Sequence, residues 1–547
     1  MKRIKQYIMF GAAALMTASC SDFLDTTPYD ALSPSTTWKT EQDAEKFAIG
    51  CYSGWEDGGR LLYMDCTSDF GYNNFSWEGY KDLANGNMTQ ANSGASFYGY
   101  TTIRRCNTFL NNVQSIEFAD EAVKKDLIAQ VRVLRAYKYF IMNWAYGGVP
   151  IIDNYDTAED AQVPRNTEQE VRDFIAKELD ECTPDLNKMP AERGRIAKGA
   201  ALALRMREAL YYDDWAMAKQ KAEEIIAMDE YDLEDDYLKL FQVAGQDSKE
   251  TILAVQYIPN TYTLYTIGQM YNNGDGGWSS IVPTYNLVDT YEMKNGMTID
   301  EQGSGYDATH PFKDRDPRLA MSVIYPGADY VKAGGAAAVF NTLDKTINGE
   351  SNANYMTSAD NASKTGLTWN KYLSPITQYA DIWKSNACPI VFRYAEVLLT
   401  WAEAENELNG PSDEVYKKIN KVRERAGMPD VDQAKYATKE TLRELIHRER
   451  AVEFAGEGLR RADILRWKTA DGKMLAEKVL NGRLERRIGT VDASVSDPGL
   501  RATITLNPDP TEVLIENRSF QPFHRYFPFS QGDIDKNPKL EQNEGYK

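Results

Sequence analysis

Histidine and the common catalytic motifs are nearly missing from this chain of 547 residues. Its three histidines, His310, His447 and His524, are too few and too widely separated to indicate a metal cluster. The patterns GxSxG, HExxH and GxxxxGKS/T do not occur, which removes the usual signs of a serine hydrolase, a zinc protease or a phosphate-binding loop. We therefore predict no catalytic residue, no metal site and no cofactor. With 81 acidic residues, the sequence cannot single out a glycosidase-like carboxylate pair.

Basic residues are too few for a nucleic-acid-binding surface. The sequence contains 62 lysines and arginines and 81 acidic residues, which gives a formal net charge of −19. It contains no local basic stripe. Such a surface repels a phosphate backbone, so nucleic acid is not an expected partner. The remaining composition, 42% hydrophobic and 26% charged, is typical of a folded globular protein.

Long apolar runs are also missing, apart from a short one at the N-terminus. Lys2, Arg3 and Lys5 precede the apolar stretch 8–16, which is too short to span a bilayer and indicates a cleaved signal peptide at 1–19. Small residues then precede Cys20, as in a bacterial lipobox, although Thr17 departs from the usual leucine. We predict a diacylated Cys20 followed by a tether at 20–37. The alternative is an ordinary secretory signal with an incidental cysteine.

The other five cysteines form no CxxC pair and no regular spacing. They are Cys51, Cys66, Cys106, Cys182 and Cys388. An odd set in a large chain does not make a disulfide framework, so we expect buried small hydrophobic side chains.

Helical periodicity dominates two parts of the chain and predicts a mainly α fold. Apolar residues between 127 and 144 recur every three or four positions until Gly147 and Gly148, and Thr167 with Glu170 forms a capping box for the next helix. Further helix pairs are expected at 197–211 with 215–228, and at 394–408 with 415–426. These hairpins resemble tetratricopeptide units, although no regular 34-residue consensus can be aligned. Residues 230–395 instead predict loops and minor strands, such as 251–257.

Aromatic residues are concentrated in loops and suggest where a ligand binds. Eight of the 32 residues from 69 to 100 are aromatic, against 11% of the chain, and they alternate with asparagines and glycines without helical period. Flat rings can pack on the C–H faces of a sugar while amides bind its hydroxyls. The equally weighted alternative is that these rings pack on helices beneath. The candidate ligand contacts are Asn73, Asn74, Trp77, Tyr80, Tyr98, Tyr271 and Trp278, whereas Trp369, Tyr372 and Trp383 are expected in the core.

Opposite charges are dense between Glu444 and Trp467. We interpret these arginines and carboxylates as architectural pairs that fix helix positions, with an ionic ligand site as the alternative.

Motifs along nearly the whole chain resemble one known family. The segment 20–25 (Cys-Ser-Asp-Phe-Leu-Asp) is similar to the start of its mature proteins. Further similar segments are Tyr100 to Asn107, Arg135 to Tyr137, Gly147 to Pro150, Pro283 to Asp289, Arg315 to Leu319, Arg393 to Leu399, Glu449 to Phe454, Glu457 to Asp463 and Asn537 to Tyr546. Together these motifs resemble the SusD/RagB family of outer-membrane nutrient-binding lipoproteins from Bacteroidetes.

The resemblance implies a helical protein held at the cell surface by outer-membrane lipid through acylated Cys20. It would cap a SusC-like TonB-dependent transporter and capture oligosaccharides without cleaving them. The expected organisation is an N-terminal helical region at 38–230 and a C-terminal region at 231–547, forming one compact unit. Peptide or other nutrient cargo is the first alternative, a surface scaffold without a small ligand is the second, and an enzyme is the third. No binding residue is transferred from the family, because its motifs belong to the scaffold.

Overall fold

The computed structural model describes residues 38–152, 157 and 159–546. The signal peptide, Cys20 and tether expected at 1–37 lie outside the described residues. The long helices are α3 (Glu41–Cys51), α6 (Thr101–Asn112), α7 (Glu121–Tyr146), α8 (Glu168–Cys182), α9 (Lys198–Tyr211), α10 (Trp215–Ala227), α15 (Tyr394–Asn409), α16 (Asp413–Arg425) and α17 (Lys439–Glu453).

Helices α7 and α8 end and begin at the residues that the sequence predicted. Helix α7 ends at Gly147, whose φ of 64° lies in the left-handed region that favours glycine. Thr167 and Glu170 form the capping box of α8, in which each side chain accepts a hydrogen bond from the other residue's backbone N–H. The helix pairs predicted around residues 197–228 and 394–426 are α9–α10 and α15–α16.

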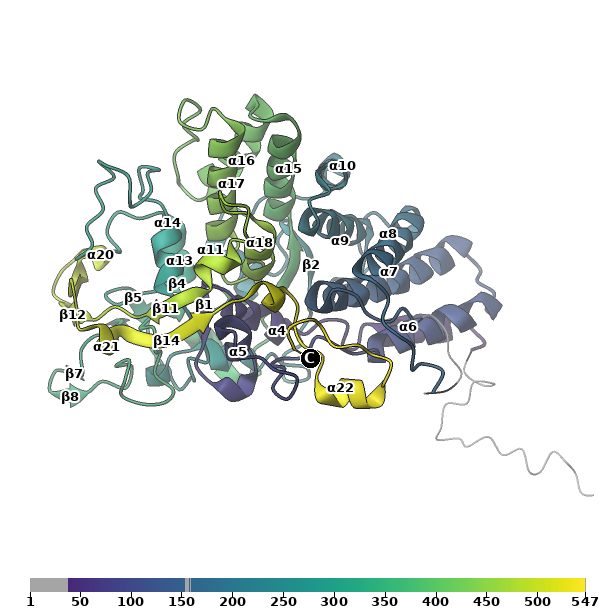
Figure 1. Cartoon of the computed structure of the whole chain (residues 1–547), viewed down its shortest axis with the longest axis horizontal. Coiled ribbons are helices and arrows are strands. Elements are labelled where there is room, and N and C mark those ends of the chain that lie inside the picture. Colours follow the sequence, from purple (N-terminus) through teal and green to yellow (C-terminus); the bar gives the residue numbers. More distant parts are fainter. Residues whose placement is uncertain (1–37, 153–156, 158, 547) are drawn as a thin grey trace, which may run out of the picture.

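Helix hairpins form the scaffold, as the sequence predicted. Helices α7 and α8, α9 and α10, and α15 and α16 pack pairwise, and α10 also packs on α15. In Figure 1 helices α6 to α10 lie at one end, α15 to α17 lie beside them, and strands such as β5, β7, β8 and β12 lie at the opposite end. The main hydrophobic core runs continuously through both halves of the chain. The expected boundary at 230/231 therefore separates regions that share one core.

The part between the two helical blocks is rich in loops and short strands. In the whole described part of the chain, the strands pair only two at a time, for example β2 (Thr251–Ala254) with β10 (Ile390–Arg393). The other strands are β1 (Gly71–Asn73), β3 (Ile281–Pro283), β4 (Val323–Ile324), β5 (Asp329–Val331), β6 (Ala337–Val339), β7 (Thr346–Ile347), β8 (Glu350–Ser351), β9 (Thr368–Trp369), β11 (Asn481–Glu485), β12 (Gly489–Val491), β13 (Ala502–Ile504) and β14 (Leu514–Ser519). The short helices include α4 (Gly58–Tyr63), α5 (Lys81–Asn85), α11 (Tyr237–Leu240), α12 (Thr266–Met270), α13 (Tyr285–Thr290), α14 (Pro317–Ser322), α18 (Arg460–Arg466), α19 (Ala476–Val479), α20 (Pro498–Arg501), α21 (Pro510–Val513) and α22 (Gln531–Lys536).

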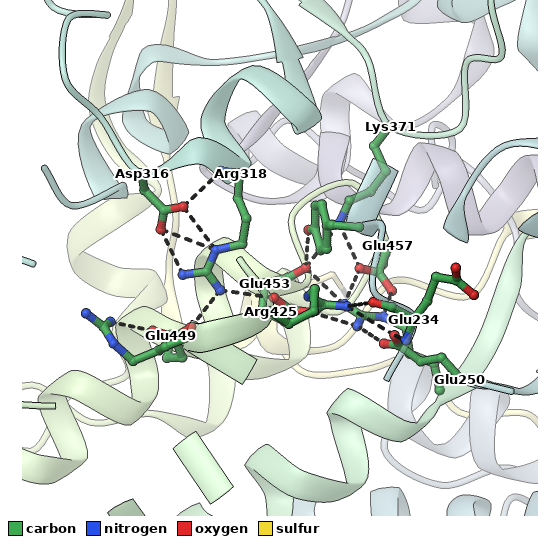
Figure 2. Close-up of polar contacts among 12 residues, drawn as sticks. Glu234, Glu250, Asp316, Arg318, Lys371, Arg425, Glu449, Glu453 and Glu457 are labelled. Atoms are coloured by element: carbon green, nitrogen blue, oxygen red, sulfur yellow. Dashed lines mark hydrogen bonds and ion pairs between the residues drawn. The ribbon is translucent and has the colours of Figure 1, made fainter. Parts of the chain in front are cut away.

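A buried ionic network joins α14, α16 and α17 to the loop region (Figure 2). Arg318 at the start of α14 donates to Asp316 at 2.8 Å, to Glu449 at 2.6 Å and to Glu453 at 3.0 Å. Arg393 at the end of β10 contacts Glu453 from the other side at 2.7 Å. Burial alone would raise the pKa of Glu453, but attraction by several buried arginines holds it far below its usual value.

The charged side chains interpreted from the sequence as architectural pairs are therefore paired in the structure: Glu449, Arg450, Glu453, Glu457, Arg460, Asp463 and Arg466. Arg393 also contacts Glu250 and Glu457, both at 2.7 Å, and Lys371 contacts Glu457 at 2.8 Å. Because these partners come from four distant segments, the network fixes the loop region against the helices.

The C-terminal segment packs against the end of helix α7. Asn543 donates to the carbonyls of Tyr146 and Phe527 at 3.1 and 2.9 Å. Arg165 contacts the Asn543 side chain at 2.6 Å and donates to the carbonyl of Gly147 at 2.6 Å. The C-terminal segment thus closes over the exit of the long helix α7.

The five cysteines of the described part are buried free thiols, which confirms their expected role in packing. Among the described helices, none combines the length and the apolar character required to cross a membrane.

Candidate functional site

Three aromatic side chains from separate segments meet at the surface and form what we call the ring platform: Tyr265, Trp278 and Trp383. The ring centroids of Trp383 lie 4.6 Å from Tyr265 and 4.8 Å from Trp278, and Tyr265 and Trp278 are 6.0 Å apart. Tyr265 is 47% exposed, and both tryptophans are half-buried. The platform therefore offers rings that are fixed by mutual contact and reachable from solvent.

Backbone contacts between these segments hold the platform. Tyr265 precedes α12, and the backbone N–H of Trp278 donates to the carbonyl of Gly268 within that helix at 3.3 Å. Trp383 belongs to a short 3-10 helix, η9 (Ile382–Lys384), which is tied to the α12 segment by the N–H of Leu264 donating to the carbonyl of Ser385 at 2.7 Å. Each ring is thus positioned by main-chain geometry as well as by its neighbours.

A local turn directs Trp278 outward. Asn272 caps the turn by accepting from the N–H of Asp275, and the N–H of Ser279 donates back to the carbonyl of Tyr271 at 2.9 Å. Ser279 has a φ of 45°, an uncommon backbone conformation for a residue other than glycine. The chain reverses its direction here, so Tyr271 and Trp278 lie near the two ends of one loop.

Trp77 lies in a short 3-10 helix, η3 (Ser76–Glu78), within the loop segment next to α12. It is 75% exposed and stacks on Phe75 with a centroid distance of 4.4 Å. The following residue, Glu78, accepts from Gln269 of α12 at 2.9 Å, and β1 before this loop pairs with β3 after the Trp278 turn. Trp77 and Trp278, both predicted from the sequence, are therefore carried by neighbouring loops.

Asn73 lies beneath the surface, and its contact with a ligand stays a prediction. This residue is 1% exposed, and its amide donates to Glu78 at 2.5 Å and to the carbonyl of Ser280 at 3.1 Å. Asn73 supports the Trp77 loop from beneath and does not face solvent. Asn74 is half-buried, and its amide donates to the carbonyls of Asp360 and Ala362, so its donors are already used.

Tyr80 and Tyr98 pack on other aromatic rings. Tyr80 stacks on Tyr63 at 4.5 Å and is half-buried. Tyr98 makes edge contacts with Tyr100 and Phe529, both at 5.3 Å, and burial raises its pKa to about 12. It lines a polar recess of about 810 Å³ on the α6 side of the molecule. For these two tyrosines, packing on the scaffold is the role that their contacts support.

Tyr271 is separated from the ring platform. It is 6% exposed, and its hydroxyl donates to the carbonyl of Ser374 at 2.6 Å. Its ring lies in the wall of a different cavity, of about 390 Å³, beside β5. Tyr271 therefore supports the loop that carries Trp278, and its contact with a ligand stays a prediction.

Sequence reasoning missed two members of the platform. Trp369 and Tyr372 are buried as expected, but Trp383 is half-buried and part of the platform, so its assignment to the core was wrong. Tyr265 belongs to the aromatic enrichment after residue 260 but was not singled out. The available signal was the density of tyrosines around it, and its ring lies 6.0 Å from that of Trp278, thirteen residues later in the sequence.

The chemistry of the platform is that of binding. The described residues contain no group of three or more histidine, cysteine or acidic side chains that could hold a metal ion. Open aromatic faces suit the C–H face of a pyranose ring, and nearby side chains such as Gln269 and Asp381 supply polar groups at the edge.

Comparisons with known proteins agree across the chain. A family profile described as "SusD family" matches residues 245–546, and one described as "Starch-binding associating with outer membrane" matches residues 22–210. Among curated relatives, SusD-like protein P25 of Formosa agariphila is 26% identical over 498 residues, covering 85% of this chain and 90% of that protein. The starch-binding protein SusD of Bacteroides thetaiotaomicron is 24% identical, covering 81% of this chain and 77% of that protein.

Solved structures show the same architecture. A SusD-like carbohydrate-binding protein from Bacteroides fragilis superposes with a TM-score of 0.78 at 27% identity, covering 92% of this chain and all of that one. Surface glycan-binding protein A from Bacteroides uniformis superposes with a TM-score of 0.67 at 18% identity over 92% of this chain, a similarity of fold alone.

Proposed function

Because this chain belongs to the SusD family, we propose that it is a carbohydrate-binding protein of the outer membrane that captures oligosaccharides on the ring platform. The observation that carries the proposal is the contact among Tyr265, Trp278 and Trp383, three rings from separate segments, of which the first is exposed and the other two are half-buried. The names of its relatives, starch-binding SusD and a SusD-like carbohydrate-binding protein, point to the same ligand class.

The form of the platform suits a ligand that must be released again. An open surface of aromatic rings gains free energy by burying the apolar faces of a sugar and leaves most sugar hydroxyls in water. Since few polar groups are desolvated, affinity stays modest, as delivery to a transporter requires. Trp77 on the adjoining loop lengthens this surface, so we expect a chain of several sugars and not a single monosaccharide.

Capture without cleavage is part of the proposal. The carboxylates of the buried network are held by arginines: Glu453, for example, contacts Arg318, Arg393 and Arg425. An acid held this way keeps a low pKa and cannot donate a proton to a glycosidic oxygen.

Membrane attachment and delivery complete the proposal. The acyl groups on Cys20 would hold the protein in the outer membrane, and a SusC-like TonB-dependent transporter would receive the glycan. Mass spectrometry of the mature N-terminus tests the first part. Co-purification of a barrel protein with the full chain, in detergent, tests the second.

Calorimetry with a panel of plant and host oligosaccharides tests the platform directly. Trp278→Ala and Tyr265→Ala should each weaken binding of the positive glycan by tenfold or more, because each removes one ring face. Trp215→Ala on α10, a half-buried tryptophan outside the platform, is the matched control and should bind normally. Equal binding by all three variants would refute the platform as the binding site.

The same panel separates sugar from peptide cargo. A peptide library run beside the glycans, with product analysis by mass spectrometry, should yield glycan binding and unaltered glycan. Binding of peptides alone, or shortening of a glycan, would overturn the proposed cargo or the absence of catalysis.

A further inference from the structure

A second concave surface, which we call the acidic groove, lies between α10, α15, α17 and the chain after α18. It consists of two recesses, of about 570 and 310 Å³, that share His447 and Trp467 as a common wall. Trp215 at the start of α10 lines the larger recess. None of its lining residues belongs to the ring platform, so this surface is not explained by glycan capture.

The charged side chains in the floor of the groove are paired with one another and held by hydrogen bonds. Glu403 accepts from Arg466 at 2.7 and 2.8 Å, and from the indole N–H of Trp467 at 3.1 Å. The ring of His447 stacks on Trp467 with a centroid distance of 3.9 Å and an interplanar angle of 14°. Burial lowers the pKa of His447, against the attraction of Glu403, so the stacked pair carries no charge at neutral pH.

The rim of the groove carries unpaired negative charge. In the part of the chain that the structure describes, Asp213, Glu440 and Glu444 around the larger recess have no ion-pair partner, and neither has Asp300 at the smaller one. The other lining acids are paired, Glu407 with Arg443 and Asp289 with Arg487. Against these four free carboxylates stands one unpaired lining amine among the described residues, that of Lys468.

Aromatic walls and free carboxylates together are complementary to organic cations. A guanidinium or ammonium group gains attraction from an indole face and from carboxylates at the same time. The larger recess has room for a long side chain, and the smaller recess continues the groove beyond the His447–Trp467 wall. A ligand that used both would be extended and would carry positive charges along its length.

We propose that the acidic groove binds an extended basic segment of a protein partner, with an arginine or lysine side chain inserted between Trp215 and the stacked pair of His447 and Trp467. An acidic polymer would be repelled by the rim. The helix hairpins around the groove give the segment a fixed surface on which to lie, as in other proteins built from stacked helix pairs. The proposal does not depend on the identity of the glycan or on glycan binding.

Binding of synthetic peptides to the purified full-length protein at low and moderate salt tests the proposal. The probes are an acetylated nonapeptide that alternates arginine with glycine, and matched peptides with glutamate or serine in place of arginine. The arginine peptide should bind, its affinity should fall at least tenfold between 50 and 300 mM salt, and the matched peptides should not bind. Equal binding of the glutamate peptide would overturn the proposal.

Charge-matched variants localise the site. The triple variant Asp213→Asn, Glu440→Gln, Glu444→Gln should lose at least tenfold in affinity for the arginine peptide, and Trp215→Ala should lose a similar factor. The control variant Glu117→Gln, Asp185→Asn, Asp235→Asn removes three exposed unpaired carboxylates elsewhere in the described chain and should bind as the wild type does. An equal loss in both triple variants would mean general charge attraction and would refute the groove.

The ring-platform variants separate this proposal from the function proposed above. Trp278→Ala should bind the arginine peptide normally, while the groove variants should bind glycan normally. If amino sugars bind in the groove and the arginine peptide does not, the partner class proposed here is wrong. All substitutions lie on exposed or half-buried side chains, and the salt dependence of wild-type binding provides a test that needs no variant.

Discussion

Gly268 and Trp383 are in direct contact at the ring platform, and only a residue without a side chain fits there. A β-carbon on residue 268 would lie 2.3 Å from the indole ring of Trp383. The position of that ring therefore depends on a glycine more than a hundred residues earlier in the chain.

Gly268→Ala should displace Trp383 and weaken glycan binding by about tenfold, equivalent to about 1.4 kcal/mol. Because the ring is half-buried and can move outward, we expect the melting temperature to fall by only a few degrees. Gly50→Ala is the control, because Gly50 lies within α3 and no heavy atom lies within 4 Å of an added β-carbon. This change should stabilise the helix by about 0.5–1 kcal/mol and leave glycan binding unaltered. Normal glycan affinity in Gly268→Ala would contradict the role of Trp383.

Trp77→Ala should change glycan affinity, whereas Tyr98→Ala should change the stability of the fold. Trp77 is largely exposed, so its removal should reduce glycan affinity by about 3- to 10-fold and leave the melting temperature nearly constant. Tyr98 packs on Tyr100, Tyr146 and Phe529, so its removal should cost about 2 kcal/mol of stability and leave glycan affinity unchanged. Calorimetry and thermal melting on both variants measure the two effects. The reverse pattern would place the ligand at the Tyr98 recess.

Arg318→Met should destabilise the fold by about 3–5 kcal/mol, because it leaves Asp316, Glu449 and Glu453 buried without their shared cation. Urea unfolding monitored by circular dichroism measures the free energy of unfolding. Lys417→Met removes an exposed ion pair to Glu414 at 3.7 Å and should change stability by less than about 0.5 kcal/mol. Similar effects of the two substitutions would show that the network contributes no more than a surface pair.

Acid should destabilise the protein partly through His524. Burial, assisted by repulsion from Arg461, lowers the pKa of this histidine to about 4, and its Nδ1 accepts from the N–H of Gln521. The unfolded chain takes up a proton near pH 6.5, whereas the folded chain does so only near pH 4. The free energy of unfolding contributed by this group therefore falls as pH decreases from about 6.5 to about 4.

His524→Gln keeps a hydrogen-bond acceptor and cannot be protonated. Its free energy of unfolding should fall less steeply than that of the wild type over the same pH interval, as measured by urea titrations at half-unit steps. Parallel pH profiles for the two proteins would rule out the buried neutral state of His524.

The helical scaffold could be predicted because its signals are local. The apolar period of α7, its end at Gly147 and the capping box at Thr167 and Glu170 each act within a few residues of the chain. The buried charge network was also foreseeable, because so many arginines and acids in one short segment can be accommodated only as pairs.

The ring platform could be predicted only in part. Trp77 and Trp278 stand out in loops rich in glycine and asparagine, but the side on which each loop residue points is decided by contacts between distant segments. Asn73 is turned inward by hydrogen bonds to Glu78 and Ser280. Trp383 was misassigned because its neighbour Gly268 lies in another segment.

The contact of Asn543 with the exit of α7 has a consequence for synthesis of the protein. Arg165, which donates to the carbonyls of Tyr146 and Gly147, is translated soon after them, whereas Asn543 follows Tyr146 by 397 residues. The last hydrogen bond at this exit of α7 therefore forms only when the C-terminal segment docks against it.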